Sequence, residues 1–233
     1  MSTHCVRLVV AFCLFLPTLA SAACQDQSAL RAAISSGYEA NPLSLIACKA
    51  MPEKPRFTIV AFINEIGNHS YTMTVLVVSK ATGEIRYRFV DEDPSFGPNG
   101  DPSHIAIDTG QYWLASNMRA FGVKVKHSLN AWDRTEDLNL FLPTTNALLR
   151  VVKDLRVASS SMRECMESHE MKRVISVAKS SSYGLYDLFV KTTRTDYVPM
   201  MANDGCSFQE VTRSNTIKLQ YAGDYYAYPS DFY

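Results

Sequence analysis

Phe57-Thr58-Ile59-Val60-Ala61-Phe62-Ile63 is the stretch of this chain that decides its fold. It consists mostly of β-branched and aromatic residues, which favour strands. A second such run spans residues 71–79, and residues 84–90 then alternate between apolar and charged side chains. Because successive side chains of a strand point to opposite faces, this pattern predicts an antiparallel meander. The first two strands are expected to be buried on both faces, and the third to have one solvent-exposed face.

Strand patterns continue toward the C-terminus. Further strands are expected at residues 104–108, 112–116, 119–127, 137–142, 173–179, 186–194 and 216–221. Residues 147–157 fit both the helical and the strand period, and residues 159–172 are expected to form a loop or a short helix. We therefore predict a mainly β chain that folds as a single antiparallel sandwich or barrel-like domain of about eight to ten strands.

The residues before the first strand have a different composition. Residues 27–36 contain good helix formers and are followed by Gly37, which predicts a short helix. A second short helix is expected within residues 43–50, and Pro52 would end it. We thus expect residues 23–55 to form a helical cap on a β core that spans residues 56–233.

The first two dozen residues are typical of a secretory signal peptide. Arg7 precedes an apolar run at residues 8–16, Pro17 interrupts that run, and small residues follow at positions 20–23. The apolar run is about half as long as a membrane-spanning helix requires. Residues 1–22 are therefore expected to be removed on export, which places residues 23–233 in the periplasm or outside the cell.

Four cysteines lie beyond this leader, and they are Cys24, Cys48, Cys165 and Cys206. An even number of cysteines in an exported chain favours disulfides, and no C-x-x-C spacing points to redox or metal chemistry. Of the three possible pairings we favour Cys24–Cys48 and Cys165–Cys206, because each pair is nearest in sequence. A lipid anchor on Cys24 is the alternative for the N-terminus, although lipoprotein signals have a Leu-like residue where this chain has Ser21.

Composition and motifs exclude several classes of function. The 23 Lys and Arg residues balance the 23 Asp and Glu residues, so no basic excess attracts nucleic acid. No second apolar run reaches about 18 residues, so no transmembrane segment is expected in the mature chain. The chain has neither G-x-x-x-x-G-K-[ST] nor G-x-G-x-x-G, and it lacks the G-x-S-x-G elbow of α/β-hydrolases. We therefore expect no cofactor.

Part of the chain resembles uncharacterised secreted bacterial proteins. The resemblance lies in Ile107-Asp108-Thr109-Gly110-Gln111-Tyr112-Trp113-Leu114-Ala115 and Arg119-Ala120-Phe121-Gly122-Val123, and later in Tyr186-Asp187-Leu188 and Leu219-Gln220-Tyr221. It covers the C-terminal half of the chain and contains strand and turn residues without a catalytic motif. It implies a bacterial envelope or secreted context, and no activity follows from it.

A long acidic segment is a candidate metal site. It contains Asp91, Asp93 and Asp101, and clustered carboxylates can bind Ca²⁺. Its spacing departs from that of the EF-hand loop, because Ser95 and Phe96 occupy positions where that loop has Asp or Asn and then Gly. A solvated loop is therefore the alternative.

His104 and Asp108 are the candidate catalytic residues. They lie four positions apart in an expected strand and therefore share a face, and a His–Asp pair can orient a general base. An ordinary polar strand rim would explain the same two residues.

The C-terminal tail is the main binding candidate, because tyrosines offer a large rigid face with a polar tip, suited to proteins and to sugars. The candidate binding residues are Tyr225, Tyr226, Tyr228, Phe232 and Tyr233. The alternative is a terminal segment that packs its tyrosines onto the core.

Together these patterns predict an exported, non-enzymatic binding protein that recognises a protein or an envelope glycan, as inhibitors and immunity proteins do. The alternative is a secreted hydrolase whose active site forms near His104 and Asp108 from segments distant in sequence.

Export makes a direct prediction about the mature N-terminus. Mass spectrometry of the protein from its native envelope is expected to find Ala23 or Cys24 as the first residue, because the A-x-A pattern precedes them. A diacylglyceryl group on Cys24 would contradict the soluble product, and retention of residues 1–22 would contradict export.

Overall fold

The computed structural model describes residues 24–41, 44–67, 69–92, 100–202 and 205–229. The expected leader, the metal candidate Asp93 and the binding candidates Phe232 and Tyr233 lie outside the described residues.

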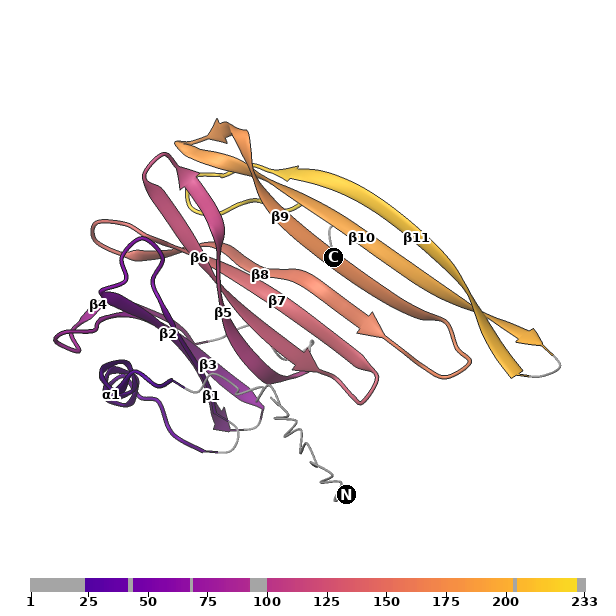
Figure 1. Ribbon diagram of the computed structural model, residues 1–233, viewed down its shortest axis with the longest axis horizontal. Coiled ribbons are helices and arrows are strands. Elements are labelled where there is room, and N and C mark those ends of the chain that lie inside the picture. Colours follow the sequence, from indigo (N-terminus) through magenta and orange to yellow (C-terminus); the bar gives the residue numbers. More distant parts are fainter. Residues whose placement is uncertain (1–23, 42–43, 68, 93–99, 203–204, 230–233) are drawn as a thin grey trace, which may run out of the picture.

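The described residues contain one helix and eleven strands, arranged as two antiparallel sheets (Figure 1). Sheet A has the order β1-β2-β3-β4, and sheet B has the order β11-β10-β9-β8-β7-β6-β5. The elements are α1 (Gln27–Ser35), β1 (Leu45–Ala50), β2 (Phe57–Gly67), β3 (Ser70–Ser79), β4 (Ile85–Asp91), β5 (Asp101–Ala115), β6 (Met118–Ser128), β7 (Asp133–Pro143), β8 (Leu148–Ser161), β9 (Ser168–Ser182), β10 (Leu185–Ala202) and β11 (Gly205–Leu219).

The two sheets pack face to face around an apolar core, which confirms the predicted mainly β fold as a sandwich. Alternate residues of β2 and β3 meet alternate residues of β5 and β6, as the period of a strand requires. The core includes Ile59, Ala61, Ile63, Met73, Val75 and Val77 from sheet A, and Ile105, Ile107, Phe121, Val123 and Val125 from sheet B. Each large aliphatic side chain buried in this way contributes roughly 1.5–3 kcal/mol. In the described part of the chain, β5 and β11 are the unpaired edges of sheet B, so this sheet does not close into a barrel.

The other face of sheet A is covered by α1. Val60, Phe62, Leu76 and Val78 pack there against the buried alanines of the helix. Both faces of β2 and β3 are therefore buried, whereas Arg86 and Arg88 of β4 are exposed, in agreement with the pattern of the sequence.

Helix α1 confirms the helix expected at residues 27–36. The Asp26 carboxylate caps it by accepting hydrogen bonds from the backbone N–H groups of Ser28 and Ala29, at 3.0 and 3.3 Å. Gly37 follows the helix with a φ of 99°, a conformation that favours glycine. Of the helices in the described residues, none is long and apolar enough to cross a membrane.

The second expected helix is wrong, because residues 45–50 form strand β1. All six residues of β1 pair with β2, from Leu45 opposite Ile63 to Ala50 opposite Thr58. Pairing at the edge of an existing sheet overrides the helix propensity of a segment too short to be stable as an isolated helix. A disulfide joins Cys24 to Cys48 and thereby ties the segment before α1 to this edge strand, which confirms the first of the two predicted pairings.

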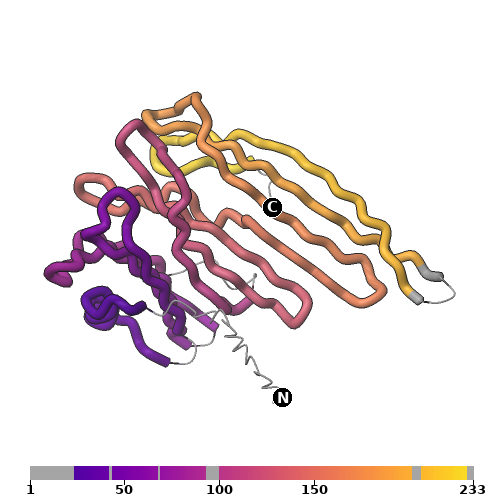
Figure 2. Tube along the Cα trace, in the orientation of Figure 1, coloured from indigo at the N-terminus to yellow at the C-terminus, as the bar shows by residue number. Residues whose placement is uncertain are grey.

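Sheet B differs from the expectation in its strand lengths. The strands expected at residues 104–108 and 112–116 form one strand, β5, with an irregular register between Asp108 and Tyr112. The loop or helix expected at residues 159–172 shrinks to residues 162–167, because β8 and β9 extend through its two ends. Strands β10 and β11 extend well beyond the predicted ranges and, with β9, form a long ribbon (Figure 2).

The C-terminal segment joins β8 to β10 and to the end of β11. Strands β8 and β9 pair only from Ala158–Lys172 to Ser161–His169, although both are long. Where they separate, the Tyr226 N–H donates to the Val151 carbonyl at 2.8 Å, and its hydroxyl donates to the Tyr186 carbonyl at 2.5 Å. Tyr226 is 0% exposed and belongs to a second apolar core with Leu188. It is therefore a core residue, and its predicted role on an exposed binding surface is wrong.

The Cys24–Cys48 bond gives a stability prediction. Replacing both cysteines by serine should lower the free energy of unfolding by up to about 3 kcal/mol, because the reduced chain gains loop entropy when unfolded. Thermal unfolding followed by circular dichroism measures this, and a variant that melts at the wild-type temperature would contradict the role of the bond. Any remaining response of the variant to reductant then reports a bond between Cys165 and Cys206.

Candidate ligand-binding site

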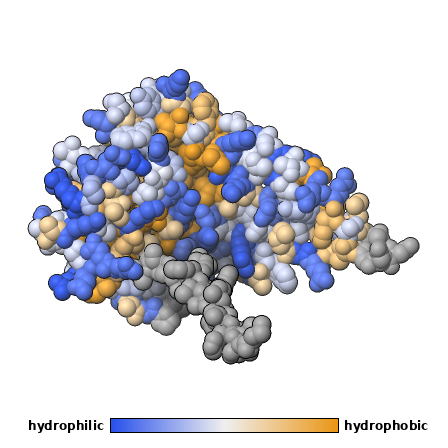
Figure 3. Space-filling model, in the orientation of Figure 1, coloured by the Kyte–Doolittle hydropathy of each residue, from blue (hydrophilic) through white to orange (hydrophobic). Residues whose placement is uncertain are grey.

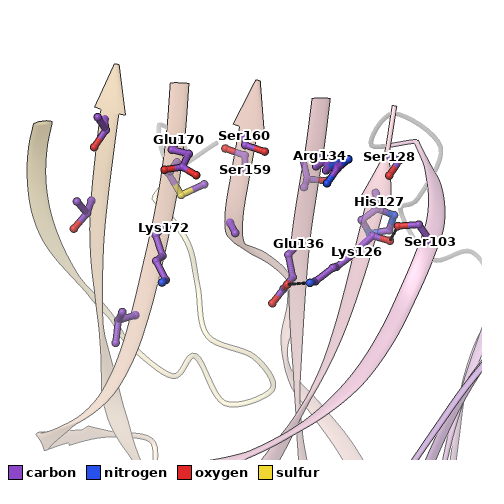
Figure 4. A pocket seen from close by; sticks show the side chains of 16 residues that line it. Ser103, Lys126, His127, Ser128, Arg134, Glu136, Ser159, Ser160, Glu170 and Lys172 are labelled. Carbon is purple, nitrogen blue, oxygen red and sulfur yellow. Dashed lines mark hydrogen bonds and ion pairs between the residues drawn. The ribbon is translucent and has the colours of Figure 1, made fainter. Parts of the chain in front are cut away.

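A trough crosses sheet B on the face opposite the sandwich core. It has a volume of about 740 Å³, and its lining comes from β5, β6, β7, β8, β9 and β10. Figure 4 shows its charged side chains on adjacent strands, with Lys126 and Glu136 joined across the floor. The distance across six adjacent strands is about 24 Å, so the trough is an elongated surface and not a compact pocket.

The strand register arranges the trough into two rows of side chains, because residues directly opposite in an antiparallel sheet share a face. The first row runs from β6 to β11 through Lys126, Glu136, Ala158, Lys172, Thr193 and Ser214. The second row runs in parallel through Ser128, Arg134, Ser160, Glu170, Thr195 and Thr212. The trough is therefore lined by charged groups on β6, β7 and β9 and by hydroxyls on the strands between and beyond them.

The hydroxyls continue both rows toward β11. The Thr193 and Ser214 hydroxyl oxygens lie 3.2 Å apart, and those of Thr195 and Thr212 lie 2.9 Å apart. Each pair of hydroxyls has further donor and acceptor capacity beyond its shared bond, so this end of the trough can form hydrogen bonds with a ligand.

The charges beside the β6–β7 end of the trough largely compensate one another. Lys124 Nζ lies 2.8 Å from Asp108 Oδ2 and 3.9 Å from Glu136 Oε1, and Lys126 Nζ lies 3.7 Å from Glu136 Oε2. Two lysines thus neutralise two carboxylates. Burial works against ionisation of Asp108, yet its bonds to Lys124 and to a backbone N–H keep its pKa below the usual value.

Arg134 and Lys172 are different, because neither has a carboxylate within 4 Å in the described part of the chain. Both side chains are exposed, and both face the trough. Glu170 is the remaining acid in the lining, so the uncompensated charge of the trough is positive. An anionic group on a ligand would find two available cations here.

A buried polar cluster supports the same strands from the opposite face. His127 and Asp137 are 1% and 3% exposed, and their Nε2 and Oδ2 atoms lie 3.5 Å apart. Arg156 Nε lies 3.2 Å from the other oxygen of Asp137. Burial lowers the pKa of His127 to about 4, and burial raises the pKa of Asp137 to about 6 although Arg156 opposes this rise.

The His104 and Asp108 side chains do not form a hydrogen bond with each other in the described residues. His104 is exposed and lies opposite Lys126, whereas the Asp108 carboxylate accepts hydrogen bonds from the Tyr112 hydroxyl, at 3.0 Å, and from the Gly110 N–H, at 2.8 Å. In the described residues no hydrogen bond links His104 with Asp108, and neither residue lines the trough. The orienting contact that general-base chemistry needs is therefore not formed.

The two described carboxylates of the acidic segment, Asp91 and Asp101, contact different partners and do not form one cluster. Asp91 pairs with Arg150, and Asp101 accepts a hydrogen bond from the Tyr71 hydroxyl at 2.9 Å and lies 3.0 Å from His69. In the described residues no group of three His, Cys, Asp or Glu side chains could hold a metal ion. The candidate Ca²⁺ site therefore has no support from Asp91 and Asp101.

The described tyrosines of the C-terminal tail differ in their surroundings. Tyr225 is 52% exposed, whereas the Tyr228 hydroxyl donates to the Lys153 carbonyl at 3.1 Å.

Cys165 and Cys206 are free thiols. They lie in the β8–β9 loop and on β11, and a hydrogen bond between them raises the pKa of Cys206 to about 11. Their disulfide stays a prediction.

Sequence reasoning missed the trough residues as a site. In the sequence, Lys126 belongs only to the polar face of a strand, and Arg134 and Glu136 alternate with other residues in the same way. The signal that could have located the site is the strand register, which joins residues as distant as Glu136 and Lys172 through Ala158.

Comparisons of this chain with protein-family models, with curated proteins and with solved structures find no match.

The buried cluster predicts opposite pH responses for two variants. The folded pKa of His127 is lowered from 6.5 to about 4, so the stability that neutral His127 provides is lost as the pH falls through this range. The folded pKa of Asp137 is raised from 3.8 to about 6, so its contribution increases as the pH falls from 6 toward 4.

Between pH 6.5 and 4.5, Asp137→Asn should therefore lose more stability than wild type, and His127→Gln should lose less, each by on the order of 2 kcal/mol. Urea unfolding at the two pH values measures the difference. Equal losses in both variants would contradict the shifted pKa values.

Proposed function

We propose that this protein is an exported, non-enzymatic binding protein whose trough binds an extended anionic glycan. The observation that carries the proposal is the pair of cross-strand rows, in which the exposed cations Arg134 and Lys172 lack acidic partners in the described residues. Ser128 and Ser160 flank Arg134, and Thr193 lies opposite Lys172. These hydroxyl groups beside the cations suit a ligand that carries hydroxyls together with carboxylate or phosphate groups.

The lining favours a glycan over a protein partner. The cores of protein interfaces are enriched in aromatic residues, Met and Arg and depleted in Lys, Glu and Ser. This lining includes Lys126, Lys172, Glu136 and Glu170 and several serines, and it contains no Phe, Tyr or Trp. The same lack of aromatic residues argues against the stacking of a neutral sugar ring and favours recognition through charge and hydrogen bonds.

Export is supported by the disulfide that the structure contains. The Cys24–Cys48 bond is compatible with a periplasmic or extracellular location, because disulfides persist in oxidising compartments. The hydrolase alternative has no corresponding support. The Asp108 carboxylate forms an ion pair with Lys124 and accepts hydrogen bonds from Tyr112 and Gly110.

Binding to an anionic polysaccharide tests the proposal. Polygalacturonate should bind the mature protein in isothermal titration calorimetry, and neutral dextran should not. The variant Arg134→Gln/Lys172→Gln should bind polygalacturonate about tenfold more weakly, because two charge-assisted contacts are lost.

The matched control is Arg31→Gln/Lys80→Gln, which removes the same two charges from exposed positions on α1 and after β3. The control should change the affinity by less than about twofold, since exposed charges distant from the ligand contribute little. Equal weakening by both double variants, or no binding of polygalacturonate by wild type, would refute the trough as an anionic glycan site.

A further inference from the structure

Strand β11 is a long, regular and exposed sheet edge. It pairs with β10 from Leu188–Leu219 to Ala202–Gly205 without a shift in register, and β10 is its one strand partner in the described residues. The side chains at residues 207–210 and 212–216 are exposed, and β11 contains no proline. Alternate N–H and C=O groups of such an edge point away from its neighbour and are available to another strand.

Apolar residues also gather near the outer end of the β10–β11 ribbon (Figure 3). Val198 and Met200 lie on one face of the ribbon and are 39% and 47% exposed, and Phe208 lies on the other face and is 41% exposed. This end of the sheet extends past β8, so a second sheet can approach β11 without meeting the sandwich core.

We propose that β11 pairs with β11 of a second copy of this chain, antiparallel and about a two-fold axis at Ser214, so that two copies of sheet B form one continuous sheet. In this arrangement the residue numbers of opposite residues add up to twice the number of the central residue, and opposite residues share a face. The edge would then be covered by an identical edge, as an isologous interface requires.

The sequence of β11 is self-complementary in this register. Glu210 lies opposite Lys218 of the second copy, and the two-fold axis creates this ion pair twice. Val211 lies opposite Ile217, Thr212 opposite Thr216, and Ser214 opposite itself. Opposite charges, paired β-branched residues and paired hydroxyls are the cross-strand contacts that stabilise antiparallel strands.

Neighbouring two-fold registers lack this complementarity. An axis at Arg213 would place two guanidinium groups directly opposite each other, which is unfavourable. An axis at Asn215 would place Glu210 opposite Gln220 and Lys218 opposite Thr212, so that no ion pair forms. Register is therefore specified by charge at this edge.

The two charged residues are free to form the pair. Glu210 has no cation within 4 Å in the described residues. Lys218 Nζ lies 3.5 Å from Asp187 Oδ2 of its own chain, but the Lys218 side chain remains 41% exposed. It can therefore contact a second carboxylate at the open edge.

A cysteine cross-link tests the register directly. In the Ser214→Cys variant the two thiols lie opposite each other across the axis, so mild oxidation with oxidised glutathione should form an intermolecular disulfide. Each thiol loses a proton and one electron, and glutathione disulfide is reduced to two thiols. Non-reducing electrophoresis should show a covalent dimer.

Thr212→Cys is the matched control, because its thiol lies on the same face but about 13 Å along the strand from its symmetry mate. It should not cross-link. Both variants also carry Cys165→Ser and Cys206→Ser, so that the free thiols of the wild type cannot cross-link. Equal cross-linking of both variants, or none with Ser214→Cys, would overturn the proposed axis.

Analytical ultracentrifugation tests the ion pair independently. Wild type should sediment as a dimer, and Glu210→Lys should sediment as a monomer, because it places two lysines opposite each other. Glu84→Lys makes the same charge change on an exposed residue before β4 and should remain a dimer. A monomeric wild type, or a Glu210→Lys variant that remains dimeric while its circular dichroism is unchanged, refutes the proposal.

Discussion

The contact of Phe121, Val123 and Val125 with sheet A is the interaction on which the rest of this structure depends. Side chains alternate along a strand, so burying these residues on one face places Lys124 and Lys126 on the other. A slip of one residue would exchange the two sets and bury the lysines. The packing that holds the sandwich together therefore also places the charged rows of the trough on the open face.

The separation of β8 from β9 is the second decisive feature. The two strands pair over four positions beside the trough and then diverge, and beyond this point β8 bonds instead to the segment around Tyr226. The sequence of the tail suggests a binding surface, but in the structure its Tyr226 completes an apolar core. The Tyr226 hydroxyl donates a hydrogen bond to the Tyr186 carbonyl. Buried tyrosines require such a partner, because an unpaired buried hydroxyl is unfavourable.

Beneath the trough, His127, Asp137 and Arg156 form a polar cluster inside an otherwise apolar layer. An isolated buried charge costs several kcal/mol, so these groups are stable only while they remain paired or neutral. The shifted pKa values of His127 and Asp137 express this constraint. The cluster links β6, β7 and β8, which are the strands that carry one end of both rows.

The sequence by itself determined the mainly β fold class, the two-sided burial of residues 57–63 and 71–79, and the helix that Asp26 caps and Gly37 follows. It also determined the Cys24–Cys48 disulfide. Local periodicity, capping and cysteine spacing act over short ranges, so the sequence alone reveals them. Tertiary structure alone decided that residues 45–50 form a strand, that β10 and β11 extend so far, and that Tyr226 is buried. It also decided the trough, since Lys126, Glu136 and Lys172 become neighbours only through the register of successive strands. Register depends on contacts between segments distant in sequence, and local pattern does not specify these contacts.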